Sequence, residues 1–473
     1  MQAHQTRIQI VMQTIRSKIA TRAYPSGARL PSVRAQAKSS GFSVSTVVEA
    51  YERLAAENLI QARPGSGFYV CAPSAPLVLA DIDPRTDYAI DPLWVSRQAL
   101  EAGPNVLKPG CGWLPDEWMY ETGVRRALRA TARASHSTLL NYATPQGLPA
   151  LRQLLARRMA ALDIEAAPRQ ILLSESSTQS IDLICRLLLE PGDTVLVDDP
   201  CYFNFHALLR AHRANAIGIP MTPSGPEIGA FAQALQQHKP RLYITNAGIH
   251  NPTGATLSPL TAHRLLKLAD SAGLVIVEDD ILADFETTPA PRLAAFDGLA
   301  NVIHIGSFSK SISAALRCGY IAARADWIDQ LTDLKIATTF GGGHLAANVM
   351  LSVLTDSGYR KHMETVRQRL AGAMQDTIAR IEPLGIKPWL TPEAGMFLWT
   401  QLPSGIDAAD LARDCLEQQV VLAPGNVFSQ SGNAGGFLRF NVAQCSDTRI
   451  FDALARSLSR LARKPAPAPA HGV

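Results

Sequence analysis

The segment Gly306-Ser307-Phe308-Ser309-Lys310, with Arg317 shortly after it, decides the fold of this chain. It follows residues 302–305, an apolar run with the length of a buried strand. The lysine amine can form a Schiff base with an aldehyde, and two hydroxyls with an arginine can hold a phosphate dianion. Pyridoxal 5'-phosphate (PLP) carries both groups on one ring. The alternative is an exposed lysine in a polar turn that binds nothing.

Apolar runs alternate with helix-length stretches from residue 170 onward. This alternation predicts an α/β fold, in which a mostly parallel sheet is covered by helices on both faces. Ligands in such folds bind outside the carboxyl ends of the strands. The predicted strands are residues 171–173, 194–197, 242–245, 274–277, 302–305 and 319–322.

Polar side chains follow several of these strands. Residues 176–179, Ser-Ser-Thr-Gln, open a helix predicted over 180–189, and a helix N-terminus with hydroxyls is either a phosphate site or a simple cap. Tyr202 presents an aromatic ring after residues 194–197. Asn251 offers an amide that can bond a phenolic oxygen, unless it only forms an Asn-Pro turn.

Two charged residues stand in apolar surroundings. Asp279 ends a predicted strand, and a buried acid is costly unless a cation pairs with it. A protonated pyridine nitrogen is such a cation, and the pair keeps the ring an electron sink. Arg439 lies in the apolar run Phe437-Leu438-Arg439-Phe440, where its planar guanidinium suits a carboxylate or a structural salt bridge.

These clusters, in this order, resemble the fold-type I PLP enzymes, the aspartate aminotransferase superfamily, over roughly residues 105–460. The resemblance implies a large PLP-dependent transferase domain with a smaller C-terminal α+β subdomain. It also implies that Lys310 is the Schiff-base lysine, and that Arg439 binds an amino-acid carboxylate. The other implied cofactor residues are Asp279 at the ring nitrogen, Asn251 at the ring oxygen, Tyr202 on the ring face, and Ser177, Thr178, Ser307, Ser309 and Arg317 at the phosphate.

The superfamily places its site at a dimer interface, so the resemblance implies a C2 homodimer in which Tyr142 reaches the neighbour's phosphate. Relatives usually carry a tyrosine two or three residues after the aspartate, where this chain has Ile281 and Leu282. In those relatives the tyrosine hydrogen-bonds the ring oxygen of PLP. We expect its absence to impair catalytic turnover more than PLP binding. Asn204, close in sequence to Tyr202, stands where some relatives have a substrate-binding arginine, and the resemblance therefore implies an effector without a second carboxylate.

The first seventy residues have the pattern of a DNA-binding domain. Apolar residues at helical spacing over 7–20 precede a break at Pro25 and Gly27, a short helix capped by Ser32 and a turn at 41–43. A second helix after Ser43 would bury one apolar face, and two short strands around 64–66 would form a wing. The residues of that face are Val44, Val47, Val48, Tyr51 and Leu54.

This winged helix-turn-helix resembles the GntR family over residues 7 to 71. The matching motifs are Gly27, Leu30-Pro31-Ser32-x-Arg34, Ser43-x-Ser45-Thr46-Val47, Ala50-Tyr51-x-x-Leu54 and Arg63-x-Gly65-Ser66-Gly67. The resemblance implies that Arg34, Ser45, Thr46 and the wing tip, with Arg63 and Ser66, contact a double-stranded DNA operator. The family usually has arginine where this chain has Val44, so one expected contact is missing.

The distribution of charge also separates the first seventy residues from the rest of the chain. Residues 1–70 carry nine Lys/Arg and three Glu, a charge of +6, whereas the whole chain of 473 residues carries only +4. A basic head favours a polyanionic partner for the head alone. Seven scattered cysteines without C-x-x-C spacing predict reduced thiols in the cytoplasm and no metal site. No apolar run is long enough to span a membrane.

The predicted domains are the winged helix-turn-helix over 1–71, a linker over 72–98, the aminotransferase-like domain over 99–462 with its C-terminal subdomain from about 340, and a disordered tail over 463–473. A GntR head on an aminotransferase-like body is the architecture of the MocR-type bacterial regulators. The expected function is a cytoplasmic, dimeric transcription regulator that binds PLP and senses either PLP itself or an amine or amino acid. The alternative is an active PLP-dependent aminotransferase that carries a DNA-binding head.

Overall fold

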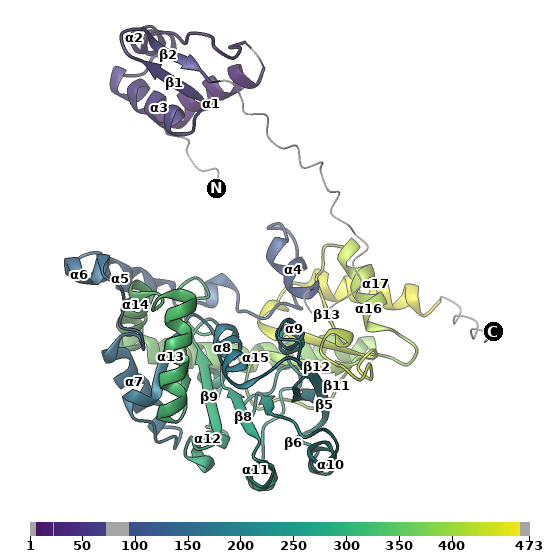
Figure 1. Cartoon of the computed structure of the whole chain (residues 1–473). Helices are drawn as coiled ribbons and strands as arrows, with labels where there is room; N and C mark the ends of the chain where they lie inside the picture. The colour runs from purple at the N-terminus through teal and green to yellow at the C-terminus, as the bar shows by residue number, and fades with distance from the viewer. Residues whose placement is uncertain (1–5, 22, 72–93, 464–473) are drawn as a thin grey trace. The chain divides into compact units, whose positions relative to one another are not determined.

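The structure is a computed structural model that describes residues 6–21, 23–71 and 94–463. These residues form two compact units, one before and one after the segment 72–93 in the sequence (Figure 1). The smaller unit is called the head below, and the larger unit the body. The body is helical from α4 (Trp94–Glu101), which begins within the predicted linker, and most of that linker and of the predicted tail lies outside the described residues.

The head is a winged helix-turn-helix. Its elements are α1 (Arg7–Ala20), α2 (Val33–Ser40), α3 (Val44–Ala56) and the antiparallel strands β1 (Ile60–Arg63) and β2 (Gly67–Val70). The predicted caps are confirmed, because Ser32 accepts from the backbone N–H of Ala35 and Ser43 accepts from that of Thr46. Both bonds satisfy amide donors that a helix start leaves unpaired.

The predicted buried face of α3 is partly wrong. Val47, Tyr51 and Leu54 are buried, but Val44 and Val48 are 50% and 37% exposed. The stripe that faces α1 is completed by Ala50 instead, since positions 47, 50, 51 and 54 share one side of a helix with 3.6 residues per turn. Val44 and Val48 lie together on another side, one residue out of phase with the core.

The body is built on an eight-stranded sheet in the order β3-β10-β9-β8-β7-β4-β5-β6. Strands β5, β4, β7, β8 and β9 are parallel, and β10 runs antiparallel between β9 and β3. The strands are β3 (Ile171–Ser174), β4 (Thr194–Asp199), β5 (Asn215–Thr222), β6 (Gly225–Pro226), β7 (Leu242–Thr245), β8 (Val275–Asp279), β9 (Val302–Ser307) and β10 (Gly319–Ala322).

All six predicted strands are present, so the predicted α/β fold is confirmed. Strand β5 was not predicted, because Gly218 and Pro220 interrupt its apolar run. It lies next to the sheet's edge, where Pro220 is tolerated.

Alternate strand side chains enter two cores, one on each face of the sheet. Leu172, Val195 and Val197 face α8 (Ser177–Leu188), α9 (Phe203–Ala211) and α13 (Ala325–Thr339). Leu173, Leu196 and Tyr243 face the opposite core. That core is covered by α7 (Pro149–Ala160), α10 (Ile228–His238), α11 (Pro259–Ala272) and α12 (Leu293–Asp297). Figure 1 shows α8 and α13 in front of β9 on the first face.

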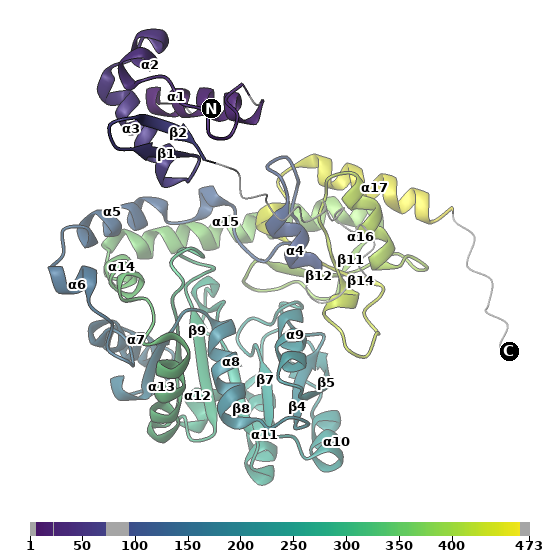
Figure 2. The same ribbon diagram turned by 45° about the horizontal axis from the view of Figure 1, so that its top comes forward.

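A smaller α+β subdomain follows at the C-terminal side (Figure 2). Its antiparallel sheet has the order β11-β12-β14-β13. Those strands are β11 (Lys387–Pro388), β12 (Phe397–Gln401), β13 (Ala423–Pro424) and β14 (Phe437–Asn441), packed with α15 (Ser357–Ile381), α16 (Ala408–Glu417) and α17 (Thr448–Leu461). On the other side of the body, α5 (Glu121–Thr131) and α6 (His136–Leu140) pack against α14 (His344–Leu354).

Residues 107–111 run beside the C-terminal sheet. Leu107 exchanges backbone hydrogen bonds with Gln419 and Val421, and Asn441 N–H donates to the Pro109 carbonyl over 2.7 Å. Gly110 lies so close that a Cβ atom would collide with the backbone of Leu422 and Ala423. This contact sets the position of the Gly110 carbonyl, which matters for the site below.

A buried ion cluster supports the end of β8. Arg292 donates to Asp280 over 2.9 Å and to Glu286 over 2.7 Å, and its side chain is fully buried. His304 lies 3.4 Å from Glu278 on the same side. The acids at positions 278 and 280 therefore both have partners within the protein.

We predict that Arg292→Met lowers the free energy of unfolding of the body by about 3–5 kcal/mol, because two buried carboxylates lose their cation. The matched control is Arg186→Met, which removes an exposed pair with Asp182 in α8 and costs about 0.5 kcal/mol or less. All six tryptophans lie in the body, so urea unfolding followed by tryptophan fluorescence reports on the body alone. Equal unfolding midpoints for the two variants would contradict the prediction.

Candidate functional site

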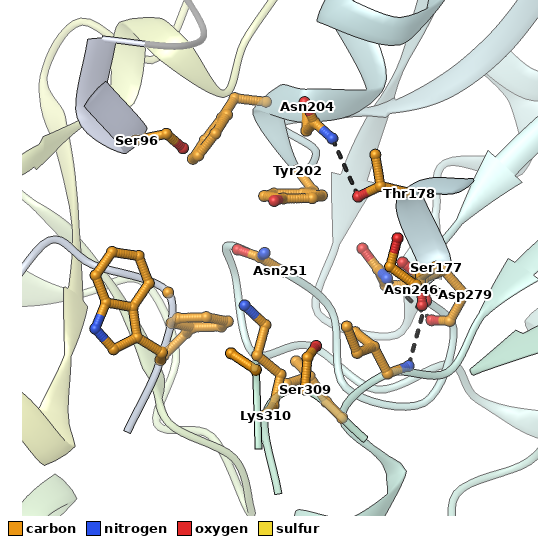
Figure 3. Close-up of a pocket in the computed structure, with 18 of the residues that line it drawn as sticks. Ser96, Ser177, Thr178, Tyr202, Asn204, Asn246, Asn251, Asp279, Ser309 and Lys310 are labelled. Atoms are coloured by element: carbon orange, nitrogen blue, oxygen red, sulfur yellow. Dashed lines mark hydrogen bonds between the residues drawn. The ribbon is translucent and has the colours of Figure 1, made fainter. Parts of the chain in front are cut away.

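A cavity of about 500 Å³ opens at the carboxyl ends of the body's parallel strands (Figure 3). Its walls come from α4, residues 108–116, the N-terminus of α8 and the C-terminal sheet. The predicted residues that line it are Ser177, Thr178, Tyr202, Asn251, Asp279, Ser309, Lys310, Arg317 and Arg439. The structure therefore brings together side chains that are up to 262 positions apart in the chain, Ser177 and Arg439.

Lys310 lies in the turn after β9, and Figure 3 shows its amine pointing into the cavity. The turn is held by Ser307, whose hydroxyl accepts from the Ser309 N–H over 3.3 Å and lies 3.2 Å from the Cys318 carbonyl. Burial, and then the positive charge of Arg439, lower the pKa of Lys310 to about 8. Near neutral pH the unprotonated, nucleophilic fraction of this amine is therefore larger than that of an ordinary lysine.

Asp279, at the end of β8, has no ion-pair partner among the described residues, unlike both of its neighbours. Its carboxylate accepts a 3.3 Å bond from the Ile281 N–H, and Ser177 lies close to it. Burial raises the pKa of Asp279 to about 6, and the Ser177 hydroxyl opposes that rise. The carboxylate is thus a buried negative charge that faces the cavity without a cation.

Arg439 is a buried positive charge that lines the same cavity. Its guanidinium donates to the Asn251 side-chain oxygen over 2.9 Å and to the Gly110 carbonyl over 2.7 Å, and it lies 4.2 Å from the centre of the Phe397 ring. Within the described chain no carboxylate pairs with it, and its Nε has no partner. Burial lowers the pKa of Arg439 to about 10. The positive charge is held in place, yet it is not neutralised.

The N-terminus of α8 faces the same cavity. The helix begins at Ser177, not at the predicted residue 180, because the Ser176 hydroxyl accepts from the Gln179 N–H and caps it. Ser177 and Thr178 thus occupy the first turn, where backbone N–H groups and the helix dipole favour an anion. Ser309 and the exposed Arg317 add a hydroxyl and a cation to this wall. Ser307 does not line the cavity and supports Ser309 instead.

The two predicted tyrosines lie in different places. Tyr202 lines the cavity just before α9, with its ring against Phe203 and Phe205. Tyr142 does not line the cavity of its own chain. It is 79% exposed and packs edge-on against Phe340, with 5.0 Å between ring centres.

Several residues that line the cavity were not predicted from the sequence. Asn246 donates to the Asp279 carbonyl over 2.9 Å and directly follows β7, so the rule of polar residues after strands would have found it. Ser96, Ala99 and Leu100 of α4 also line the cavity. They lie at the boundary between the predicted linker, which ends at residue 98, and the predicted body domain, and they carry no motif. The remaining missed residues include Lys108, Gly112, Trp113 and Phe397.

The predicted DNA-contacting residues of the head lie on helices α2 and α3 and in the wing. Arg34 and Ser45 are exposed on α2 and α3, and the Ser43 hydroxyl bonds those of Ser45 and Thr46 over 2.9 and 2.7 Å. In the wing, the Arg63 guanidinium lies 4.4 Å from the centre of the Tyr69 ring. Ser66 bonds the hydroxyl of the same tyrosine over 2.6 Å, so Tyr69 orders both predicted wing residues.

Comparison with known families gives the class of each unit. Residues 8–70 match the bacterial regulatory proteins of the gntR family, and residues 116–456 match aminotransferase class I and II. The chain belongs to the aminotransferase class I and II family and carries a GntR-family DNA-binding domain, which is the domain combination of MocR-type regulators.

Individual relatives share this organisation. The chain is 30% identical over 455 residues to the HTH-type transcriptional regulator YdcR of Escherichia coli (strain K12), which covers 92% of this chain and 95% of the relative. It is also 24% identical over 440 residues to the HTH-type transcriptional regulator NorG of Staphylococcus aureus (strain USA300), and that match covers 90% of this chain and 98% of NorG.

Among solved structures, the body resembles LysN, the alpha-aminoadipate aminotransferase of Thermus thermophilus, complexed with N-(5'-phosphopyridoxyl)-L-leucine. The TM-score is 0.71 at 26% identity, and the match covers 78% of this chain and 95% of LysN. Within the described residues no helix has the length and apolar character needed to cross a membrane, and no group of His, Cys, Asp or Glu is arranged to hold a metal ion.

Proposed function

We propose that this chain is a DNA-binding transcription regulator whose body binds PLP and an amino acid or amine. The single observation that carries the proposal is the arrangement around Lys310. A buried carboxylate, Asp279, and a buried guanidinium, Arg439, face one cavity without ion-pair partners among the described residues, and an amine with a lowered pKa lies in the same cavity. Unpaired buried charges are costly, so such a site is suited to ligands that together carry both complementary charges.

PLP fits this donor set. Its pyridinium would supply the cation that Asp279 lacks, and its phosphate would lie at the N-terminus of α8 near Ser309 and Arg317. The Asn251 oxygen already accepts from Arg439, which leaves its amide N–H₂ free to donate to a ring oxygen. When bound, PLP supplies an aldehyde and an electron sink for amine chemistry. Tyr202 contributes an aromatic face to the same wall.

The second ligand is proposed to be an α-amino acid or an amine. Arg439 offers the two parallel donors that a carboxylate accepts, and Phe397 shields it from water. Support comes from LysN, whose structure contains a phosphopyridoxyl-leucine ligand. Ile281 and Leu282 line the wall where relatives usually have a tyrosine, which favours retention of a ligand over rapid turnover.

A route from the cavity to the head is available through α4. Buried Trp94 and Val95 anchor this helix in the body, whereas Ser96, Ala99 and Leu100 line the cavity. Residues 72–93 connect α4 directly to the head. A ligand that contacts α4 would bias its position, and a coupling of about 1–3 kcal/mol would change operator affinity by about 5- to 150-fold.

A homodimer is part of the proposal. Exposed apolar side chains gather where α6, Tyr142 and the loop between α13 and α14 meet. A patch of this kind on a globular domain marks an interface, and a twofold dimer would bring Tyr142 to the neighbouring subunit. The side chains of this patch are Leu139, Leu140, Tyr142, Phe340 and Leu345.

We predict that the purified protein with PLP absorbs visible light and that Lys310→Ala loses this band, because the amine that binds the aldehyde is gone. Lys335→Ala is the matched control, since Lys335 is also buried with a pKa lowered to about 8 but does not line the cavity. A band that persists in Lys310→Ala contradicts the assignment. Steady transamination at about 1–1000 per second would favour the aminotransferase alternative.

We predict that wild-type protein sediments as a dimer and that Phe340→Glu sediments as a monomer, because the substitution places a charge in the patch. Phe296→Glu is the control, since Phe296 is 58% exposed on α12 and Phe340 is 64% exposed. Sedimentation velocity distinguishes the species. A dimer that survives Phe340→Glu and dissociates with Phe296→Glu would place the interface elsewhere.

We predict that DNA binding weakens steeply with salt, with a slope of about −0.9 per phosphate contact. Arg34→Ala should lower affinity for genomic fragments recovered with the protein and reduce that slope by about 1, while PLP binding is unchanged. Arg16→Ala is the control, because Arg16 lies on α1 and pairs with Glu57 at the far end of α3. A flat salt response argues against the proposed function of the head.

A further inference from the structure

The first two turns of α3 present an apolar stripe to solvent. Val44 and Val48 are 50% and 37% exposed, and four-residue spacing places them on one side of the helix. The core of the head is filled by other residues of α3, namely Val47, Ala50, Tyr51 and Leu54, which are all fully buried. The stripe therefore has no packing role within the head.

This stripe also lacks positive charge. The sequence of α3 from Val44 to Glu52 contains no Lys or Arg, and its first arginine, Arg53, is paired with Glu49 over 2.8 Å. The exposed cations Arg34 and Lys38 belong to α2, and Arg63 belongs to the wing. The basic groups that neutralise phosphates thus flank the beginning of α3, while α3 itself offers valines and the Ser45 hydroxyl.

In a winged helix-turn-helix, the N-terminal residues of the second helix contact base edges in the major groove. The apolar group that the major groove presents is the thymine C5-methyl. We propose that Val44 and Val48 read thymine methyl groups in the operator, an inference that rests on the proposed DNA-binding function. Four residues of helix rise by about 6 Å, which is roughly two base-pair steps of about 3.4 Å. The two valines would therefore contact thymines within two steps of each other.

The test uses the full chain and duplexes selected by the wild-type protein from a random DNA library. Each thymine of a selected duplex is replaced in turn by deoxyuridine, which removes the methyl group and keeps the hydrogen-bonding edge. We expect about a fourfold loss of affinity at each contacted thymine, the effect of one buried methyl group. Val44→Ala should abolish the loss at one position, and Val48→Ala at the other.

Ile10→Ala is the matched control, because Ile10 is 39% exposed on α1 and should leave the deoxyuridine pattern unchanged. If selected duplexes bind the wild type with no position sensitive to deoxyuridine, methyl readout is wrong although DNA binding stands. The same conclusion follows if the sensitive positions survive in the Val44→Ala/Val48→Ala double variant. If no duplex is enriched at all, the proposed DNA-binding function itself fails. Urea unfolding of the variants confirms that the substitutions leave the fold intact.

Discussion

Two buried charges of opposite sign, Asp279 and Arg439, face one cavity without an ion-pair partner among the described residues, and the body is arranged to keep them so. Asp279 ends β8 between Glu278, which lies beside His304, and Asp280, which is paired with Arg292. The guanidinium of Arg292 is therefore already engaged by other carboxylates. Arg439 is held by two neutral oxygens, of Asn251 and Gly110. Isolating charges in this way costs stability that the large cores on both faces of the sheet must offset. Under the proposed function, the pyridinium of PLP and the carboxylate of an amino acid would recover that energy.

The sequence predicted the parts of this arrangement that follow local rules. Uninterrupted apolar runs located the strands, and polar residues after those strands located Lys310, Asp279 and Asn251. It could not predict β5, where Gly218 and Pro220 hide the run, or α4, whose contribution to the cavity depends on packing against distant residues. Val47 is buried and Val44 is exposed, although the two residues are less than one helical turn apart. The spacing of apolar residues alone therefore did not separate them.

The two units divide the chemistry between them. The body concentrates its unpaired charges in one cavity, where small charged ligands would be selected by position and geometry. The head carries exposed cations on α2 and the wing, which suit the phosphates of DNA. Its helix α3 carries an apolar stripe and a hydroxyl, which suit methyl groups and base edges in the major groove. α4 lines the cavity and follows the connecting segment in the sequence, and under the proposed function it would carry the effect of a bound ligand to the head.

The most direct test of the central claim is a paired measurement on Asp279→Asn. If the carboxylate is reserved for a ligand, the ligand-free variant should unfold at a higher urea concentration than the wild type, because an unpaired buried charge has been removed. The same variant should bind PLP more weakly. A variant that is less stable and binds PLP as tightly as the wild type would show that Asp279 serves the fold and not the ligand.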